Sequence, residues 1–194
     1  MKLPKIIGIA GTNGAGKDTL GELLAERSGY KFVSVSDILR AELTRQGLPH
    51  ERERLSDLST KWAREHGPGI LSAKTIEAYV EEEKAEGYRG LAIGSIRRPG
   101  EAHVIQQEGG IVVWVDANQK TRYNRISSNA RGRITDVLSY EQWAVEEERE
   151  MSPSTDDPTV LNMTATRDAC DKVIMNDFAT QDEYRDYLIK EFEL

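Results

Sequence analysis

The sequence contains few of the residues on which disulfide and metal chemistry depend. Cys170 is the single cysteine, and the three histidines stand apart at positions 50, 66 and 103. One cysteine excludes an intramolecular disulfide and a cysteine metal cluster, and the histidines lack the spacing of a metal-binding set. We therefore interpret His50, His66 and His103 as surface or partly packed side chains.

Long apolar runs and a basic charge balance are missing as well. The run over residues 6–10 is too short for the core of a signal peptide, and no run approaches the ~20 residues of a membrane helix. The formal net charge of −7 argues against non-specific nucleic-acid binding, although it leaves room for a local basic cleft. We expect a single domain over residues 1–194, located in the cytoplasm, without membrane or nucleic-acid partners.

The sequence does contain a regular alternation of short apolar runs and amphipathic segments. Strands are predicted over residues 5–10, 31–35, 90–94, 111–116 and 172–175. Helices are predicted over about residues 17–28 and 120–128, from a capping box at Ser139 and Gln142 to about residue 150, from Pro158 onward, and from a capping box at Thr180 and Glu183. Such alternation predicts an α/β fold with a parallel sheet covered by helices.

A long, mostly helical segment over about residues 36–88 separates the second and third predicted strands. Turn signals at residues 47–49 (GLP) and 67–69 (GPG) divide it. The segment is much longer than a crossover between parallel strands requires. We therefore expect a functional insertion, such as a lid or an acceptor-binding region.

A glycine-rich segment joins the first strand to the first helix. It reads Gly11, Thr12, Asn13, Gly14, Ala15, Gly16, Lys17, Asp18, Thr19, which is the spacing of a phosphate-binding P-loop. Small residues let backbone amides turn toward a phosphate, and the helix N-terminus adds partial positive charge. Lys17 supplies a full charge for the β- and γ-phosphates. The segment predicts binding of a nucleoside triphosphate, which we take to be ATP with Mg²⁺.

Asp18 stands where a P-loop usually has serine or threonine. A carboxylate beside phosphates repels them unless a cation lies between. One hypothesis is that Asp18 helps to hold Mg²⁺, directly or through water, while Thr19 supplies the hydroxyl. The alternative is a solvated aspartate stabilised by the helix dipole.

Arginines follow the predicted strands. Arg40 comes soon after the second strand, and Arg97 and Arg98 come directly after the third. Because the carboxyl ends of parallel strands form the ligand crevice, we expect these three arginines around the same crevice as the P-loop. A clamp on donor and acceptor phosphates explains them better as a group than solvated surface charge does, although any one of them could be a surface residue.

These segments resemble the nucleoside monophosphate kinase superfamily of P-loop proteins, which has related sequences at the P-loop, at residues 36–40 (SDILR) and at residues 96–99 (IRRP). The chain is more similar still to an archaeal group of P-loop kinase-like proteins related to dephospho-coenzyme A kinase and adenylate kinase. That likeness includes residues 45–49 (RQGLP), 64–69 (REHGPG), 120–125 and 173–177 (VIMND). It covers nearly the whole chain. It implies a three-layer fold on a five-stranded parallel sheet of order 2-3-1-4-5, an acceptor-binding insertion over about residues 36–88 and a short lid over about residues 127–139.

The resemblance also implies roles for single residues. Arg40 and Arg97 would bind the acceptor phosphate, Asp37 matches an acidic position before the acceptor arginine, and Asn176 would line the adenine pocket. The arginines of the donor side and the lid would be Arg122, Arg125, Arg131 and Arg133. One departure concerns the third strand, where relatives carry Asp-Gly and this chain has Gly94 and Ser95. An acidic group often used near magnesium is therefore missing, and Asp18 could compensate.

Three functions are compatible with these patterns. The first is an ATP-dependent kinase with a nucleotide-like acceptor, for which Asp37 is the candidate base if a hydroxyl attacks. The second is a nucleotide hydrolase or switch, because Asp116 ends an apolar strand as in a Walker B pattern; we favour the interpretation that Asp116 is a strand-end aspartate. The third is a nucleotide-binding regulator without catalysis. The chain would act as a monomer or a homodimer, which the sequence leaves open.

Overall fold

The fold is built on a five-stranded parallel sheet with the strand order β2-β3-β1-β4-β5. The structure is a computed structural model and describes residues 3–128 and 138–194. The strands are β1 (Ile6–Gly11), β2 (Tyr30–Ser34), β3 (Gly90–Ile96), β4 (Ile111–Asp116) and β5 (Lys172–Met175). The predicted fold class and the strand order implied by the resemblance are both confirmed.

Strand β1 lies at the centre of the sheet because it is apolar on both faces. All six of its residues are buried, and it pairs with β3 on one side and β4 on the other. Continuous apolar runs of this kind are typical of parallel strands covered on both faces. The central position of β1 places the segment that follows it, the P-loop, at the middle of the sheet's carboxyl edge.

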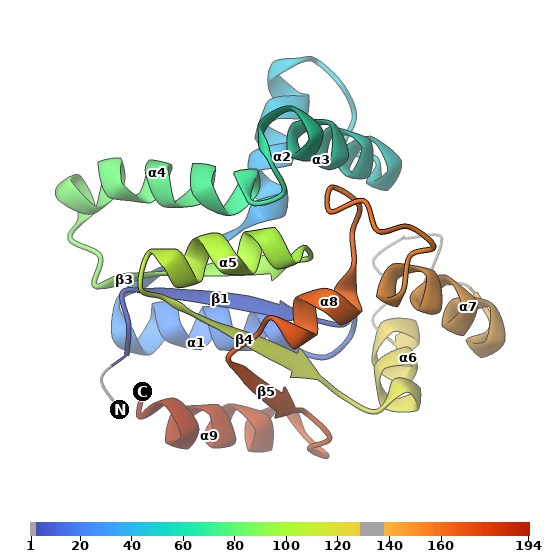
Figure 1. The fold of residues 1–194 in the computed structure, drawn as a ribbon. Coiled ribbons are helices and arrows are strands. Elements are labelled where there is room, and N and C mark those ends of the chain that lie inside the picture. The colour runs from blue at the N-terminus through green and yellow to red at the C-terminus, as the bar shows by residue number, and fades with distance from the viewer. Residues whose placement is uncertain (1–2, 129–137) are drawn as a thin grey trace.

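Helices cover both faces of the sheet (Figure 1). The helices of the described residues are α1 (Lys17–Ser28), α2 (Val35–Arg45), α3 (Arg52–His66), α4 (Ile70–Glu86), α5 (Pro99–Gln107), α6 (Gln119–Ser128), α7 (Tyr140–Met151), α8 (Met163–Asp168) and α9 (Gln181–Phe192). Helices α1 and α9 pack on one face through Leu20, Leu24 and Leu188, whereas α2, α4, α5 and α8 contribute to the core on the other face.

Most of the predicted elements are present. The insertion between β2 and β3 is helical and breaks where the turn signals stand, giving α2, α3 and α4. Both capping boxes are formed, at Ser139 before α7 and at Thr180 before α9. Helix α5 is an element that the sequence patterns above do not predict.

The helix predicted to begin at Pro158 is wrong. Asp157 instead closes a turn: its Oδ1 accepts hydrogen bonds from the Thr159 amide at 2.9 Å and from the Thr159 hydroxyl at 2.6 Å. The next helix, α8, begins five residues later, where the Asn162 side chain accepts from the amide of Ala165 at 2.9 Å. Local side-chain bonds to the backbone therefore compete successfully with the helix at Pro158.

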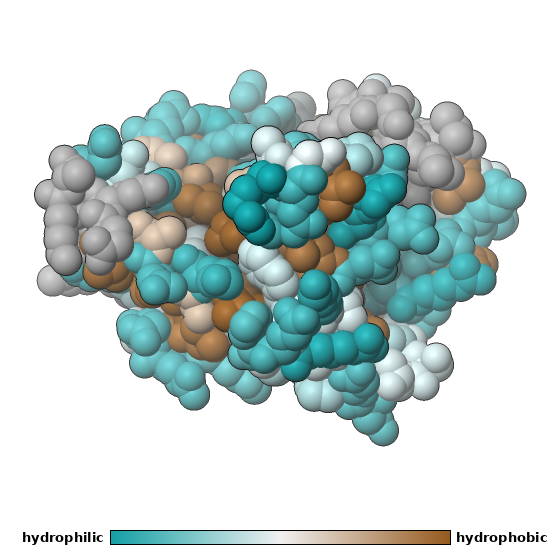
Figure 2. Space-filling model, turned by 90° about the horizontal axis from the view of Figure 1, so that it is seen from above, coloured by the Kyte–Doolittle hydropathy of each residue, from teal (hydrophilic) through white to brown (hydrophobic). Residues whose placement is uncertain are grey.

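The surface is mostly hydrophilic when the molecule is seen from above, with apolar side chains showing in scattered patches (Figure 2). Within the described residues, no helix combines the length and the apolar character needed to cross a membrane.

Candidate functional site

The P-loop leaves the centre of the sheet and turns into α1. Gly16 caps α1 with a φ of +86°, and a Cβ at this position would lie 2.6 Å from Nδ2 of Asn176. A Cβ on Gly11 would lie 2.1 Å from the carbonyl oxygen of Val115 on the neighbouring strand. Both positions therefore require glycine, which keeps the loop tight against β4 and the chain after β5.

Asn176, in the chain after β5, bonds to the backbone of the P-loop. Its buried Nδ2 donates to the carbonyl of Ala15 at 2.7 Å, and its backbone amide donates to Asp116 O at 2.6 Å. Arg125 on α6 donates to the carbonyls of Asn176 at 3.0 Å and Phe178 at 3.4 Å. The two residues expected beside the nucleotide thus lie together at the P-loop, while their contact with a nucleotide stays a prediction.

Asp116 at the end of β4 joins the P-loop to α6. Its Oδ1 accepts from the Thr12 hydroxyl at 2.6 Å and lies 3.3 Å from Nε of Arg122, and its Oδ2 accepts from the Trp114 indole at 3.2 Å. These contacts use both carboxylate oxygens within the protein. They support the interpretation of Asp116 as a strand-end aspartate.

Arg122 fastens α6 to α7. It forms an ion pair with Glu147, with 3.0 Å between Nη2 and Oε2, and its guanidinium lies 5.4 Å from the ring centre of Trp143. Burial lowers the pKa of Arg122, and the charge of Asp116 opposes that shift. Tyr123 and Tyr140 pack near Trp143 at ring-centre distances of 5.7 and 6.3 Å. Arg122 therefore acts as a structural connection between the two helices.

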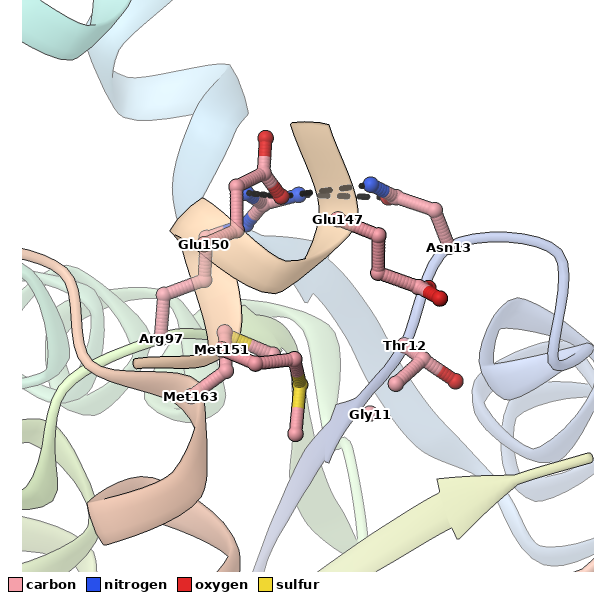
Figure 3. Close-up of a pocket in the computed structure, with 8 residues that line it drawn as sticks. All are labelled: Gly11, Thr12, Asn13, Arg97, Glu147, Glu150, Met151 and Met163. Carbon is pink, nitrogen blue, oxygen red and sulfur yellow. Dashed lines mark hydrogen bonds and ion pairs between the residues drawn. The ribbon is translucent and has the colours of Figure 1, made fainter. Parts of the chain in front are cut away.

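A shallow hollow, open to solvent, lies between the P-loop, the end of β3 and α7 (Figure 3). Across its mouth, Arg97 donates from Nη1 to Glu150 Oε2 at 3.2 Å and from Nη2 to Asn13 Oδ1 at 3.3 Å. Asn13 Nδ2 in turn donates to Glu150 Oε2 at 3.4 Å. The lining residues are Gly11, Thr12, Asn13, Arg97, Glu147, Glu150, Met151 and Met163.

The structure thus brings Arg97 to the P-loop, as the sequence suggests, and adds Glu150, which the sequence interpretation missed. Trp143, Glu147 and Glu150 follow one another at spacings of four and three residues, so they share one face of α7. Trp143 is the buried residue of this helix. That spacing, read from Trp143, is the signal that could have placed Glu150 on the inward face.

Arg98 lies in the interior, away from the hollow, and does not take the position expected of an acceptor-binding arginine. Its side chain is 1% exposed and forms an ion pair with Glu101 at 3.2 Å. It also donates to the Ser59 hydroxyl at 2.8 Å and to the Thr159 carbonyl at 2.8 Å. Burial raises the pKa of Glu101, whereas the charge of Arg98 opposes that shift. Arg98 therefore ties α3 and the turn at Thr159 to the end of β3.

The other predicted acceptor residues lie outside the lining of the hollow. Arg40 and Asp37 form an exposed ion pair on α2 at 2.6 Å, and Asp37 also accepts from the backbone amide of Ser34 at 3.3 Å. Asp37 is thus part of the cap of α2. Arg131 and Arg133, together with most of the expected lid, fall outside the described residues.

The end of β3 leaves little room for a side chain at position 94. A Cβ on Gly94 would lie 2.9 Å from the ring of Phe32, so the ring fills the space that a carboxylate would need. Ser95 follows with a φ of +66° at a register shift between β1 and β3. Its hydroxyl accepts from the Ser34 hydroxyl at 2.9 Å.

The metal candidates Asp18 and Thr19 stand in the first turn of α1. Asp18 is exposed, whereas Thr19 is buried beside the P-loop. Across residues 3–128 and 138–194, no three His, Cys, Asp or Glu side chains are grouped as a metal site. A magnesium ion carried on nucleotide phosphates needs only one or two protein ligands, so the oxygen donors present here are suitable in kind.

Comparisons with known proteins agree with this geometry. A family model described as an AAA domain matches residues 10–142, well over half of the chain. A UPF0200 protein of Sulfurisphaera tokodaii is 32% identical over 142 residues, which cover 73% of this chain and 74% of that protein. Another UPF0200 protein, from Pyrobaculum aerophilum, is 29% identical over 148 residues, with 75% and 77% covered.

Solved structures show the same fold at low sequence identity. The shikimate kinase of Acinetobacter baumannii in complex with shikimate matches with a TM-score of 0.54 and 18% identity, covering 99% of this chain and 94% of that one. The shikimate kinase of Bacteroides thetaiotaomicron matches with a TM-score of 0.55 and 13% identity, with 97% and 98% covered. The fold is therefore that of a P-loop kinase, and the chain, which matches the AAA-domain model, belongs to the UPF0200 family.

Proposed function

We propose that the protein is an ATP-dependent phosphotransferase that moves the γ-phosphoryl group to a nucleotide-like small-molecule acceptor. The observation that carries the proposal is the placement of Arg97 at the mouth of the P-loop, 3.3 Å from the Asn13 side chain. Phosphoryl transfer depends chiefly on positioning and on positive charge at the phosphates. A P-loop with an arginine brought to it from another strand supports that chemistry.

The donor half of the site is the P-loop. Backbone amides of Gly14 to Thr19 and the charge of Lys17 would hold the phosphates, and Asn176 with Arg125 would shape the nucleotide pocket. Magnesium would be held by Thr19 and Asp18 and would neutralise charge on the phosphates. In the Asp18 hypothesis, Asp18→Ala weakens magnesium-dependent ATP binding; unchanged binding would favour the helix-dipole alternative.

The acceptor half would lie between the end of β3 and the insertion formed by α2, α3 and α4. Arg97 would face the acceptor, and Arg40 would reach it from α2 after releasing Asp37. Arg98 would act indirectly, because its bonds to Ser59 on α3 fix the insertion to β3. Arg131 and Arg133 would act as arginines of the lid, as the resemblance to the kinase superfamily implies.

The alternative is an acceptor-independent hydrolase or switch. Asp116 would then be expected to face a nucleotide-bound metal or water, yet its carboxylate is bonded to Thr12, Trp114 and Arg122. The structure therefore favours the transferase.

The test is an assay of ADP release with Mg²⁺ and a panel of AMP, CMP, dTMP and dephospho-coenzyme A. We expect acceptor-stimulated turnover in the wild type and its loss in Lys17→Ala. ADP release at a rate that no acceptor changes would instead identify a hydrolase. Tight ATP binding without turnover would identify a regulator.

A further inference from the structure

Glu150 is a carboxylate placed directly at the P-loop. Its Oε2 lies 3.2 Å from Arg97 Nη1 and 3.4 Å from Asn13 Nδ2, and its side chain is 27% exposed (Figure 3). Helix α7 carries it there, since Trp143 on the same helix is buried against α6. Glu150 therefore stands between the loop expected to hold the triphosphate and the arginine expected to meet the acceptor.

The other carboxylates considered for this role are engaged elsewhere. Glu147 also lines the hollow, but both of its oxygens face the guanidinium of Arg122. Asp116 is bonded on both oxygens. Asp37, the base suggested by the sequence, is exposed on α2, where it caps the helix and pairs with Arg40. Glu150 is bonded as well, but its partners Arg97 and Asn13 belong to the site itself, so it is the best placed of these groups to take a proton at the P-loop.

The charge at Arg97 also bears on the class of acceptor. With Glu150 at 3.2 Å, the guanidinium is already paired with a negative group. The γ-phosphate of ATP would already lie near this carboxylate, and an acceptor that attacked through a phosphate would add a further anion, which raises the repulsion among like charges at short range. A hydroxyl is neutral and can donate a hydrogen bond to the carboxylate, so it suits this position better.

We propose that the acceptor attacks through a hydroxyl group and that Glu150 is the catalytic residue that accepts its proton; this rests on the phosphotransferase function proposed above. The acceptor oxygen forms a bond to the γ-phosphorus while the bond from that phosphorus to the β,γ-bridging oxygen breaks, and the electron pair stays on ADP. The hydroxyl proton passes to the Glu150 carboxylate and then to solvent. Because the transition state of phosphoryl transfer is loose, a carboxylate is a strong enough base.

The experiment compares the wild type with Glu150→Gln, which keeps the size of the side chain and a hydrogen-bond acceptor for Arg97. The substrates are MgATP with AMP, CMP and dTMP, with the corresponding nucleosides, and with dephospho-coenzyme A. Phosphorus NMR then separates a new phosphate ester from a diphosphate product. We expect ester products, and we expect Glu150→Gln to lower kcat by about 100- to 10,000-fold, with little change in the acceptor KM or in ATP binding.

The matched control is Glu148→Gln, the same substitution at an exposed position of α7, which should leave turnover unchanged. If Glu150 accepts the proton, the turnover of the wild type falls at low pH, and this fall is missing from the pH–rate profile of Glu150→Gln. If Glu150 has only a structural role, the two pH–rate profiles have the same shape.

Two results would overturn the proposal and leave the phosphotransferase function standing. One is a wild type that makes only diphosphate products. The other is a Glu150→Gln variant as active as the wild type or more active, which would mean that the carboxylate merely blocks the site. A wild type without acceptor-dependent turnover would count against the phosphotransferase function and the role of Glu150 together.

Discussion

Arg97 and Arg98 are neighbours in the chain with opposite surroundings. The side chain of Arg97 is 27% exposed at the hollow, and that of Arg98 is 1% exposed in an ion pair with Glu101. Removing one partner of a buried ion pair leaves an uncompensated charge. We therefore expect Arg98→Ala to lower the free energy of unfolding by about 3–5 kcal/mol in urea denaturation.

Arg97→Ala is the matched comparison for Arg98→Ala. The loss of its partly exposed ion pair should cost about 1 kcal/mol or less, while acceptor-stimulated turnover falls. Equal losses of stability in the two variants would contradict the burial difference on which the assignment of these arginines depends.

A second prediction at this scale concerns Gly16. Gly16→Ala adds a Cβ at 2.6 Å from Asn176 and forces alanine to a φ of +86°, so we expect a loss of about 2–5 kcal/mol and weaker ATP binding. Gly47→Ala is the control, because its φ is +69° and nothing lies within 4 Å. That variant should lose only about 1 kcal/mol and bind ATP as the wild type does. Calorimetric ATP titration and urea denaturation check both.

Sequence patterns predicted the strand and the helix that flank the P-loop, and they predicted the surroundings of the loop less well. The P-loop is local: its glycines, Lys17 and the flanking strand and helix are contiguous in the chain. Packing between elements far apart in the sequence decides the rest. It buries Arg98, sets the contacts of Asp116 and places Glu150 beside Asn13. Charge and spacing in the sequence do not reveal which arginine a fold buries.

At the scale of elements, the helix starts that carry capping boxes were predicted and the turn at Pro158 was not. Ser139 and Thr180 each have a partner three residues on, which specifies a helix start locally. Pro158 gave a weaker signal, since proline also suits the turn that Asp157 and Thr159 form. The core helix α5 begins with proline too, yet the patterns did not predict it.

Thr180 caps the N-terminus of α9. The Thr180 side chain accepts from the amide of Glu183 at 3.2 Å, and α9 buries Tyr184, Leu188 and Phe192 against the sheet. Thr180→Ala should lower the free energy of unfolding by about 1 kcal/mol, measured by urea denaturation. Thr180→Ser retains the hydroxyl and should stay close to the wild type; a loss as large as that of alanine would show that the methyl group matters instead.

At the scale of the molecule, the alternation of strands and helices was enough to predict a parallel sheet, and the strand order came from the resemblance. Both agree with the observed order β2-β3-β1-β4-β5. Composition and charge do not specify which strand becomes central. The fully apolar β1, followed by a loop that needs a close approach to β4, explains that position physically.

Ligand binding provides the prediction for the whole molecule. A ligand that binds only the folded state at 100 times its Kd stabilises that state by about 2.7 kcal/mol. For a chain of this size, MgATP should therefore raise the Tm by about 5–10 °C in a thermal melt. Lys17→Ala should abolish the shift, and removal of magnesium with EDTA should reduce it. An undiminished shift in Lys17→Ala would place the nucleotide elsewhere.

Trp143 lies on α7, the helix that carries Glu150, and can report on nucleotide binding through its fluorescence. The chain has three tryptophans, at positions 62, 114 and 143, and only Trp143 lies on α7. Replacing the other two by phenylalanine leaves one tryptophan, beside the Arg122 guanidinium, whose emission can be excited selectively over that of the tyrosines. Its emission then reports, without any label, whether α7 shifts when a nucleotide enters the P-loop, and stopped-flow mixing would time that shift against product formation.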